Sequence, residues 1–252
     1  MAKRLLLLAL IALVLPVMAA DPPDSDPPEF VFARLAYSGG RGGFFGFGGF
    51  GRGAWATDYP EADYKFMYGI KRLSNVRVQE EENPIRIMDE NLFKYPYVYA
   101  VEVANMNLSM AEAERLREYL LRGGFMHADD FWGLYEFQAF QNQMRKVFPD
   151  RAIEELPLDH EIFHTFFDID RVAQIPNINN GCNGGRTWED RSDTVPRILG
   201  IKDGTGRVMV VITYNSDLGD AWEWMDEPCY PELYSGQAYR MGLNFIVYAM
   251  SH

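Results

Sequence analysis

Strand-like and helix-like segments alternate through the middle of the chain, and this alternation restricts the possible folds more than any other feature. The Val- and Tyr-rich run 95–103 (YPYVYAVEV) is typical of a strand. A helix is predicted next, because Ser109 and Glu112 form a capping box and Gly123-Gly124 can end it. The run 125–130 (FMHADD) then predicts another strand. Strands separated by helices run parallel and are covered on both faces, so we predict an α/β three-layer sandwich with a mostly parallel central sheet.

Further segments fit the same architecture. Residues 29–37 (EFVFARLAY) and 207–214 (RVMVVITY) are rich in apolar, β-branched and aromatic residues and are predicted to be strands. Apolar residues recur at helical spacing over about 134–148 and about 238–249. We also predict a helix that carries Phe66, Met67, Ile70 and Leu73, with Asp58 as its N-cap because Glu61 follows three residues later. These elements predict a single domain over residues 29–252.

The first residues have the layout of a secretory signal. Lys3 and Arg4 precede the apolar run 5–14, and small residues occur around positions 17–20. We expect residues 1–20 to be removed on export, which leaves a Pro- and Asp-rich linker, 21–28, before the domain. The mature chain is then periplasmic or extracellular. No later run reaches about 18 uninterrupted apolar residues, so no membrane span is predicted in it.

The charge of the chain limits its partners. The net charge of −12 becomes −14 once Lys3 and Arg4 are lost. This acidity disfavours nucleic acid and anionic lipid as partners. It is compatible with an unknown protein, a glycan or a small-molecule ligand, and with the binding of cations.

Cys182 and Cys229 occur in loop-like surroundings of a chain that we expect to be exported. An oxidising compartment permits a disulfide between them. Because the sequence does not show how far apart they lie, a disulfide and two free thiols both remain open.

The stretch 38–53 (SGGRGGFFGFGGFGRG) has nine glycines, four phenylalanines and two arginines. So many glycines do not support a regular element, so we predict a loop inserted into the domain. It can be a lid over the sheet edge or a surface insertion without a ligand. It is not a phosphate-binding Walker loop, because no Gly-Lys-Ser/Thr sequence closes it.

Ligand sites of open parallel sheets lie beyond the carboxyl ends of the strands, so the segments that follow the predicted strands supply the candidate site. Asp129 and Asp130 are the catalytic candidates. Two carboxylates about 5 Å apart repel by roughly 3 kcal/mol, so they would share a proton, bind a cation or be held by backbone donors. Alternatively, one of them caps the helix that starts near Leu134. The candidate binding residues are Trp55, Asp58, Glu102, Asn105, Trp132, Asp217, Asp220, Trp222 and Glu223.

Several of these residues have both a functional and a structural interpretation. Oxygens of Asp129, Asp130 and Asp217 suit calcium or magnesium, although no cofactor is required by the sequence. Trp222 can stack on a sugar ring or close the core. His127 lies in a predicted buried strand, where a core imidazole and a general base are both open.

His160 and His164 have the spacing of a zinc pair, but this spacing brings two histidines to one face only in a helix. The surrounding segment contains Pro157 and many residues that favour strands. We therefore predict a structural turn in which Asp159, His160 and His164 take part, and no zinc site.

A set of motifs in fixed order resembles the family called domain of unknown function 4159, over about residues 29–251. The motifs are WATDYP (55–60), YPY (95–97), LREYLLRGGF with ADD and a glycine (116–133), VFPD (147–150), LDH with His164 (158–164), SDLGDAWE (216–223) and RMGLNFIVY (240–248). Glu161 stands where a proline is more usual, and Ala221 where a glycine is common. The resemblance implies a fold similar to the class I glutamine amidotransferases, a flavodoxin-type sandwich, and it implies no established activity.

An amidotransferase needs a cysteine at a sharp strand-to-helix turn, where this chain places Asp129 and Asp130. Cys182, in NNGCNGG, lacks a preceding apolar strand. We therefore expect no glutamine hydrolysis. Two functions remain: a binding or assembly module with an acidic and aromatic cleft, or a hydrolase in which Asp129 or Asp130 acts as a base or holds a metal.

Overall fold

The computed structural model describes residues 27–39, 53–79 and 81–252. The predicted leader, 1–20, lies outside the described residues, as do most of the linker 21–28 and most of the glycine-rich stretch 38–53. No described helix has the length and apolar character that crossing a membrane requires.

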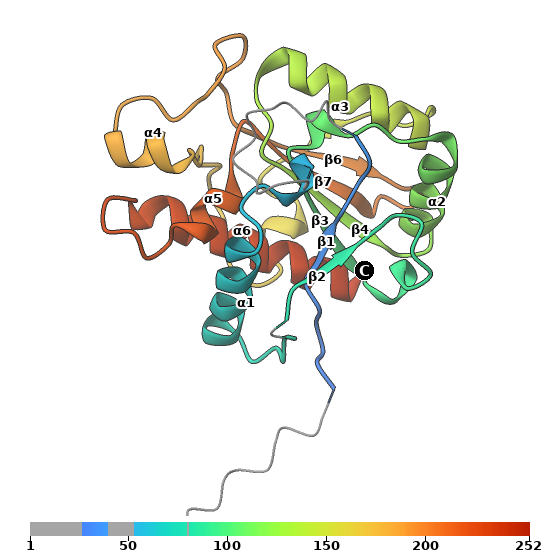
Figure 1. Cartoon of the computed structure of the whole chain (residues 1–252), viewed down its shortest axis with the longest axis horizontal. Helices are drawn as coiled ribbons and strands as arrows, with labels where there is room; N and C mark the ends of the chain where they lie inside the picture. Colours follow the sequence, from blue (N-terminus) through green and yellow to red (C-terminus); the bar gives the residue numbers. More distant parts are fainter. Residues whose placement is uncertain (1–26, 40–52, 80) are drawn as a thin grey trace, which may run out of the picture.

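A seven-stranded mixed sheet with strand order β2-β1-β3-β4-β7-β6-β5 forms the centre of the protein (Figure 1). Its first five strands in this order are parallel neighbours, as predicted. The strands are β1 (Ala33–Leu35), β2 (Asn83–Ile85), β3 (Tyr97–Val101), β4 (Phe125–Asp129), β5 (Glu154–Glu155), β6 (Arg197–Lys202) and β7 (Val208–Tyr214).

Strand β6 departs from the predicted parallel pattern. It pairs with β7 in the antiparallel sense, and β5 pairs antiparallel with β6. A tight turn explains the direction, since Asp203 N donates to Arg207 O at 2.9 Å and Asp203 Oδ1 accepts from Thr205 N at 2.8 Å. A hairpin turn joins only antiparallel strands.

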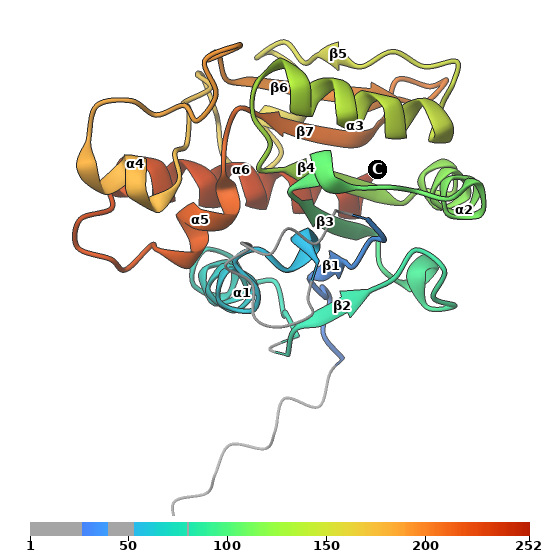
Figure 2. The same ribbon diagram turned by 45° about the horizontal axis from the view of Figure 1, so that its top comes forward.

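The described part of the chain contains six α-helices: α1 (Glu61–Leu73), α2 (Met110–Leu121), α3 (Gly133–Val147), α4 (Ile178–Asn183), α5 (Leu218–Glu223) and α6 (Glu232–Ser251). One core packs α1, α5 and α6 on one face, and a second core packs α2 and α3 on the other. Alternate residues of β3 enter different cores, Tyr97 and Tyr99 one and Val98 and Ala100 the other. Figure 2 shows α3 in front of the strands and α6 behind them, so the protein has three layers.

The predicted start of α2 is confirmed, because the capping box between Ser109 and Glu112 is formed. Two other predicted caps are wrong. No aspartate caps α3; instead Glu136 accepts from Trp132 N at 2.6 Å, and Ser192 Oγ accepts from Leu134 N at 2.9 Å. Asp58 does not cap α1 through its side chain, because its left-handed backbone (φ 60°) places Oδ2 beside Gly219.

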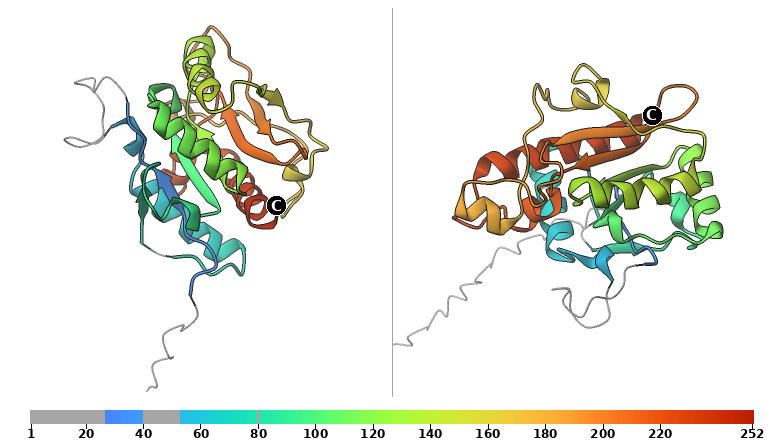
Figure 3. Two further views of the ribbon diagram at one scale, coloured as in Figure 1. Left: turned by 90° about the vertical axis from the view of Figure 1, so that its right-hand side faces the viewer. Right: turned by 90° about the horizontal axis from the view of Figure 1, so that it is seen from above.

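Cys182 and Cys229 form a disulfide with an S–S distance of 2.04 Å. It joins α4 to the loop after α5, and these two short helices lie together at one end of the molecule (Figure 3). The same end receives the carboxyl end of β7, from which α5 follows after three residues.

Candidate functional site

Three strands end in the same unusual backbone conformation. Glu102, Asp130 and Asn215 directly follow β3, β4 and β7, with φ values of 52°, 51° and 56°. Asp58, before α1, is the only other non-glycine residue with positive φ in the described ranges. Left-handed backbone costs a non-glycine residue about 1 to 3 kcal/mol and concentrates at functional sites. These four residues therefore mark the carboxyl edge of the sheet as the candidate site.

Asp129, the last residue of β4, is held entirely by protein donors. Its Oδ2 accepts from Tyr99 Oη at 2.7 Å, Leu218 N at 2.9 Å and Gly219 N at 3.1 Å, and its Oδ1 from Thr213 Oγ1. Burial raises its pKa to about 6, and these hydrogen bonds oppose the rise. Because two of the donors are amides of the first turn of α5, Asp129 has a structural role at the start of that helix.

Asp130, the next residue, is held much more loosely. Its Oδ1 accepts from Trp132 Nε1 at 2.9 Å, and Oδ2 accepts no hydrogen bond from the described residues. The residue is only 7% exposed. Burial raises its pKa well above the ordinary value, and the charges of Glu102, Asp58 and Glu189 add to this. Asp130 thus keeps a carboxylate oxygen available for a ligand.

Asp58, Asp217 and Asp220 form a close group of carboxylates. One oxygen from each lies within 4.8 Å of the others. Asp217 Oδ1 accepts from Asp220 N at 2.8 Å, and Asp220 Oδ2 accepts from Ile178 N at 2.6 Å. Asp58 Oδ2 is shielded from solvent and has no hydrogen-bond partner among the described residues. We call Asp58, Asp130, Asp217 and Asp220 the acidic site.

The electrostatics of the acidic site are unbalanced. Burial raises the pKa of Asp58, Asp217 and Asp220, and neighbouring carboxylates add to the rise for Asp58 and Asp217. Within residues 27–39, 53–79 and 81–252, no salt bridge joins the site to a lysine, arginine or histidine. The site therefore needs protons or bound cations to offset its charge.

The nearest buried cation, Arg34 on β1, is already paired. Its Nε donates to both carboxylate oxygens of Asp63, at 2.8 and 3.0 Å, and Nη2 donates to Oδ1. Its Nη1 donates to the carbonyls of Trp55 (3.2 Å) and Thr57 (2.8 Å). Arg34 thus fixes the loop that carries Asp58, while Asp63 matches its charge.

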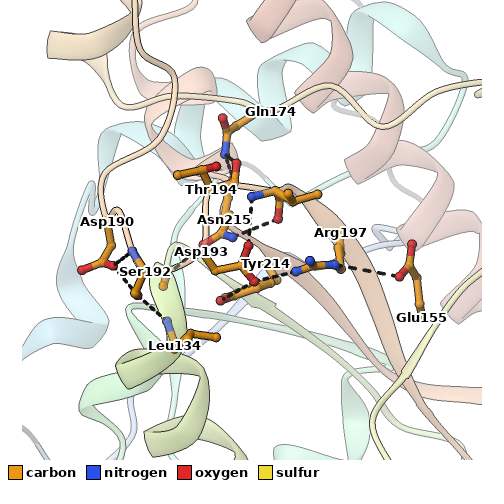
Figure 4. Close-up of polar contacts among 12 residues, drawn as sticks. Leu134, Glu155, Gln174, Asp190, Ser192, Asp193, Thr194, Arg197, Tyr214 and Asn215 are labelled. Atoms are coloured by element: carbon orange, nitrogen blue, oxygen red, sulfur yellow. Dashed lines mark hydrogen bonds and ion pairs between the residues drawn. The ribbon is translucent and has the colours of Figure 1, made fainter.

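Figure 4 shows the network that holds Asn215 at the end of β7. Its Nδ2 donates to Val195 O at 2.9 Å, and its backbone carbonyl accepts from Gln174 Nε2 at 3.1 Å. Its Oδ1 accepts from Gly133 N at 2.9 Å, at the start of α3. Both polar atoms of the Asn215 side chain thus have protein partners, and the residue joins the end of β7 to α3.

A polar groove of about 510 Å³ lies beside Glu102 and is lined by Gly39, Ala104, Asn105, Asn107, Tyr135, Glu136 and Ala139. Asn105 Nδ2 donates to Glu102 Oε2 at 3.0 Å. Burial and the neighbouring Glu136 and Glu189 raise the pKa of Glu102 to about 7. The Tyr135 side chain at this groove is 84% exposed.

The tryptophans among the predicted binding residues lie mostly in the interior. Trp222 is fully buried and stacks on Phe66, with ring centroids 4.0 Å apart. It therefore packs in the core and cannot offer a ring face to a sugar. Trp132 is also buried, whereas Trp55 is half-buried. Glu223 is half-buried beside the acidic site, and the charge of Asp220 helps to raise its pKa.

His160 and His164 lie in a turn around a short 3-10 helix, Glu161–Phe163. His160 Nδ1 accepts from Ile162 N at 3.2 Å, and His164 contacts Asp168 and Leu158 O at 3.0 and 2.9 Å. The carboxylate of Asp159 is exposed and makes no hydrogen bond with the described residues. Neither histidine belongs to the groups of carboxylates at the acidic site.

His127, on β4, is fully buried between two hydroxyls. Tyr97 Oη lies 2.9 Å from its Nδ1 and Thr213 Oγ1 lies 3.0 Å from its Nε2. Burial lowers its pKa to about 3, so it is a neutral core imidazole at physiological pH.

Sequence reasoning missed Glu189, which lies within 4.8 Å of Asp130 and Asp217. It also missed Glu136 and Arg34. A cluster of polar residues around Glu189 (TWEDRSD, 187–193) was the available signal, but nothing in it indicates which strand end it meets.

The chain matches the family described as domain of unknown function (DUF4159) over residues 31–250, and it belongs to that family. A comparison with curated proteins gives no match.

Proposed function

We propose that this is an exported binding module whose acidic site takes a hard divalent cation, calcium or magnesium, through Asp58, Asp217 and Asp220. One observation carries the proposal: Asp58 Oδ2 is shielded from solvent, has no hydrogen-bond partner and lies close to two further carboxylates. A buried polar atom without a partner is costly, and native proteins rarely leave one unsatisfied. Three converging carboxylates are the oxygen donors that these cations prefer.

The charge balance supports the same assignment. Two carboxylates 4.8 Å apart repel by about 3 kcal/mol at an effective dielectric constant near 20. A divalent cation between them replaces this repulsion by attraction, and without it the raised pKa values favour shared protons. We therefore expect protons and cations to compete for the site, so that cation affinity rises with pH.

Export is supported by the predicted leader and by the disulfide between Cys182 and Cys229, which is typical of oxidising compartments. The amidotransferase-like scaffold is supported by the three layers and by the sharp turn between β4 and α3. Asp130 occupies that turn, and both cysteines of the chain are in the disulfide. These observations support a scaffold without glutaminase activity.

A metal-dependent hydrolase is the second candidate, and one observation favours it. Asp130, which is only 7% exposed, combines a left-handed turn at a strand end with a carboxylate oxygen that accepts no hydrogen bond from the described residues. Such a carboxylate could accept a proton from a water molecule that a neighbouring cation polarises. Asp129 does not fit this role, because four protein donors saturate it.

Isothermal titration calorimetry of the chelator-treated protein with calcium and with magnesium tests the proposal. We expect saturable binding by the wild type and at least a tenfold loss of affinity in Asp58→Asn. Asp159→Asn is the matched control, since it makes the same change at an exposed residue outside the site. Equal affinity in wild type and Asp58→Asn, or no binding to the wild type, would overturn the proposal.

A further inference from the structure

Asp217 belongs to two groups of carboxylates at once. Its first group contains Asp58 and Asp220, and its second contains Asp130 and Glu189. In each group the donor oxygens lie within 4.8 Å of one another. The two groups do not merge into one, so Asp217 lies between them.

The position of Asp217 is fixed by the backbone. It is the N-cap of α5, its own N–H donates to Ile175 O at 2.9 Å, and it is only 3% exposed. Its Oδ1 accepts from Asp220 N at 2.8 Å, and Oδ2 accepts no hydrogen bond from the described residues. Each carboxylate oxygen has two lone pairs, so Asp217 retains acceptor capacity on both oxygens.

Each group also contains an aspartate with a carboxylate oxygen that accepts no hydrogen bond from the described residues. In the first group it is Asp58, whose Oδ2 has no partner. In the second it is Asp130, which is 7% exposed and whose Oδ2 accepts nothing from the described residues. Each group thus has one carboxylate oxygen that the described residues leave free to bind a ligand.

Glu189, in the second group, is held in place by contacts different from those of the other acids. It comes from the segment after α4, and Asn177 Nδ2 donates to its Oε1. Asn177 also caps α4, and Ile178 N donates to Asp220 Oδ2 at 2.6 Å. The disulfide holds the other end of α4. An exposed carboxylate is thus held close to Asp130 and Asp217.

We propose that Asp217 bridges two divalent cations, one held with Asp58 and Asp220 and the other with Asp130 and Glu189. This inference rests on the proposed function, to which it adds a second cation and a bridging ligand. Two cations that share a carboxylate form the arrangement that binds and polarises one oxygen ligand from two sides. The five carboxylates carry one more negative charge than two divalent cations supply, so the pair takes water or a neutral hydroxyl or carbonyl oxygen in preference to a phosphate ester.

Manganese is the probe, because both the number of ions bound per chain and the paramagnetic spectrum of the bound ions can be measured. Wild-type protein, saturated with manganese and passed through a desalting column, is expected to hold two ions per chain. Glu189→Gln is expected to hold one, with the affinity of the remaining ion changed less than threefold. Glu189 is exposed, so this variant should fold, and circular dichroism checks that it does. Asp58→Asn is likewise expected to hold one ion, and Asp159→Asn two.

Electron paramagnetic resonance decides whether the two ions share a ligand. A bridged pair gives an exchange-coupled manganese signal, which is expected in the wild type and absent from Glu189→Gln. One ion per wild-type chain, or two ions without coupling, would overturn the inference but leave the proposed function standing. No bound ion would overturn both.

Phenyl phosphate tests the charge argument separately. We expect manganese affinity to stay within threefold when this phosphate monoester is added, because the site retains excess negative charge. A tenfold gain in affinity would contradict the assignment of a neutral ligand.

Discussion

Two charged regions meet at the loop 53–60 and are built in opposite ways. On one side Arg34 and Asp63, both fully buried, neutralise each other through three hydrogen bonds. On the other side Asp58, Asp217 and Asp220 make no salt bridge with a lysine, arginine or histidine in the described part of the chain, although the charge of Arg34 acts on Asp58. The fold alone accounts for the first region, because every charge has its partner. The second region requires protons or an added cation, which is what distinguishes a binding site from a structural ion pair.

The same contrast appears between two adjacent residues. Asp129 accepts four hydrogen bonds from protein groups, whereas Asp130 accepts one from the described residues. Adjacent strand residues point to opposite faces, and the left-handed turn at Asp130 breaks this alternation. Asp129→Asn and Asp130→Asn are therefore expected to change the stability of the protein by different amounts.

The largest effect is expected from Asp63→Asn. The change leaves the Arg34 charge buried and unpaired, which costs about 3 to 5 kcal/mol. Urea unfolding measures the loss. Asp150→Asn removes an exposed carboxylate that pairs with Arg117 at 3.6 Å, and should cost no more than about 1 kcal/mol. Similar losses in the two variants would remove the distinction between a structural pair and a surface pair.

A smaller effect is expected from Asp129→Asn, about 1 to 3 kcal/mol of unfolding free energy. The amide cannot accept from all four donors, so at least one buried donor loses its partner. Asp130→Asn should change stability by less than about 0.5 kcal/mol, or raise it, because it removes one negative charge from a crowded site. If Asp130→Asn is the more destabilising of the two in denaturant unfolding, the assignment of roles is wrong.

A third effect concerns pH. The pKa of Glu102 is raised to about 7 from its ordinary value of 4.5, so between these values the folded state binds more protons than the unfolded state. Lowering the pH from 7 to 4.5 therefore stabilises the metal-free protein through Glu102, and raising it destabilises the protein. His127 acts in the opposite direction below pH 6.5, because its folded pKa is about 3.

The substitution Glu102→Gln separates the contribution of Glu102 to pH-dependent stability from that of His127. The variant should lose part of the stabilisation that the wild type gains between pH 7 and 4.5, while the contribution of His127 is unchanged. Melting temperatures of both proteins across this range provide the measurement. Parallel curves of melting temperature against pH for the two proteins would contradict the raised pKa of Glu102.

Local signals predicted much of the fold. The capping box at Ser109 and Glu112 and the apolar strand runs depend on neighbouring residues, and the structure agrees with them. The antiparallel β6 was missed, although the turn Asp203–Arg207 between two apolar runs was visible. The parallel order of the strands was sufficient to predict at which edge of the sheet the acidic residues lie.

The division of roles within the site could not be predicted. The donors that saturate Asp129 come from Tyr99, Thr213, Leu218 and Gly219, which are 30 to 90 residues away in the sequence. Glu189 reaches Asp217 only because α4 is held by Asp220 and by the disulfide. Asp and Asn adopt left-handed backbone more readily than most residues, as Asp130 and Asn215 do here, but residue type alone does not show at which Asp or Asn it occurs, and Glu102 has no such preference.

The most direct test of the account is a crystal of the protein soaked in manganese and measured at a wavelength where manganese scatters anomalously. The account predicts an anomalous peak bounded by the carboxylates of Asp58, Asp217 and Asp220, and its loss in crystals of Asp58→Asn. Peaks confined to exposed carboxylates, with none inside the acidic site of a fully soaked wild-type crystal, would contradict it.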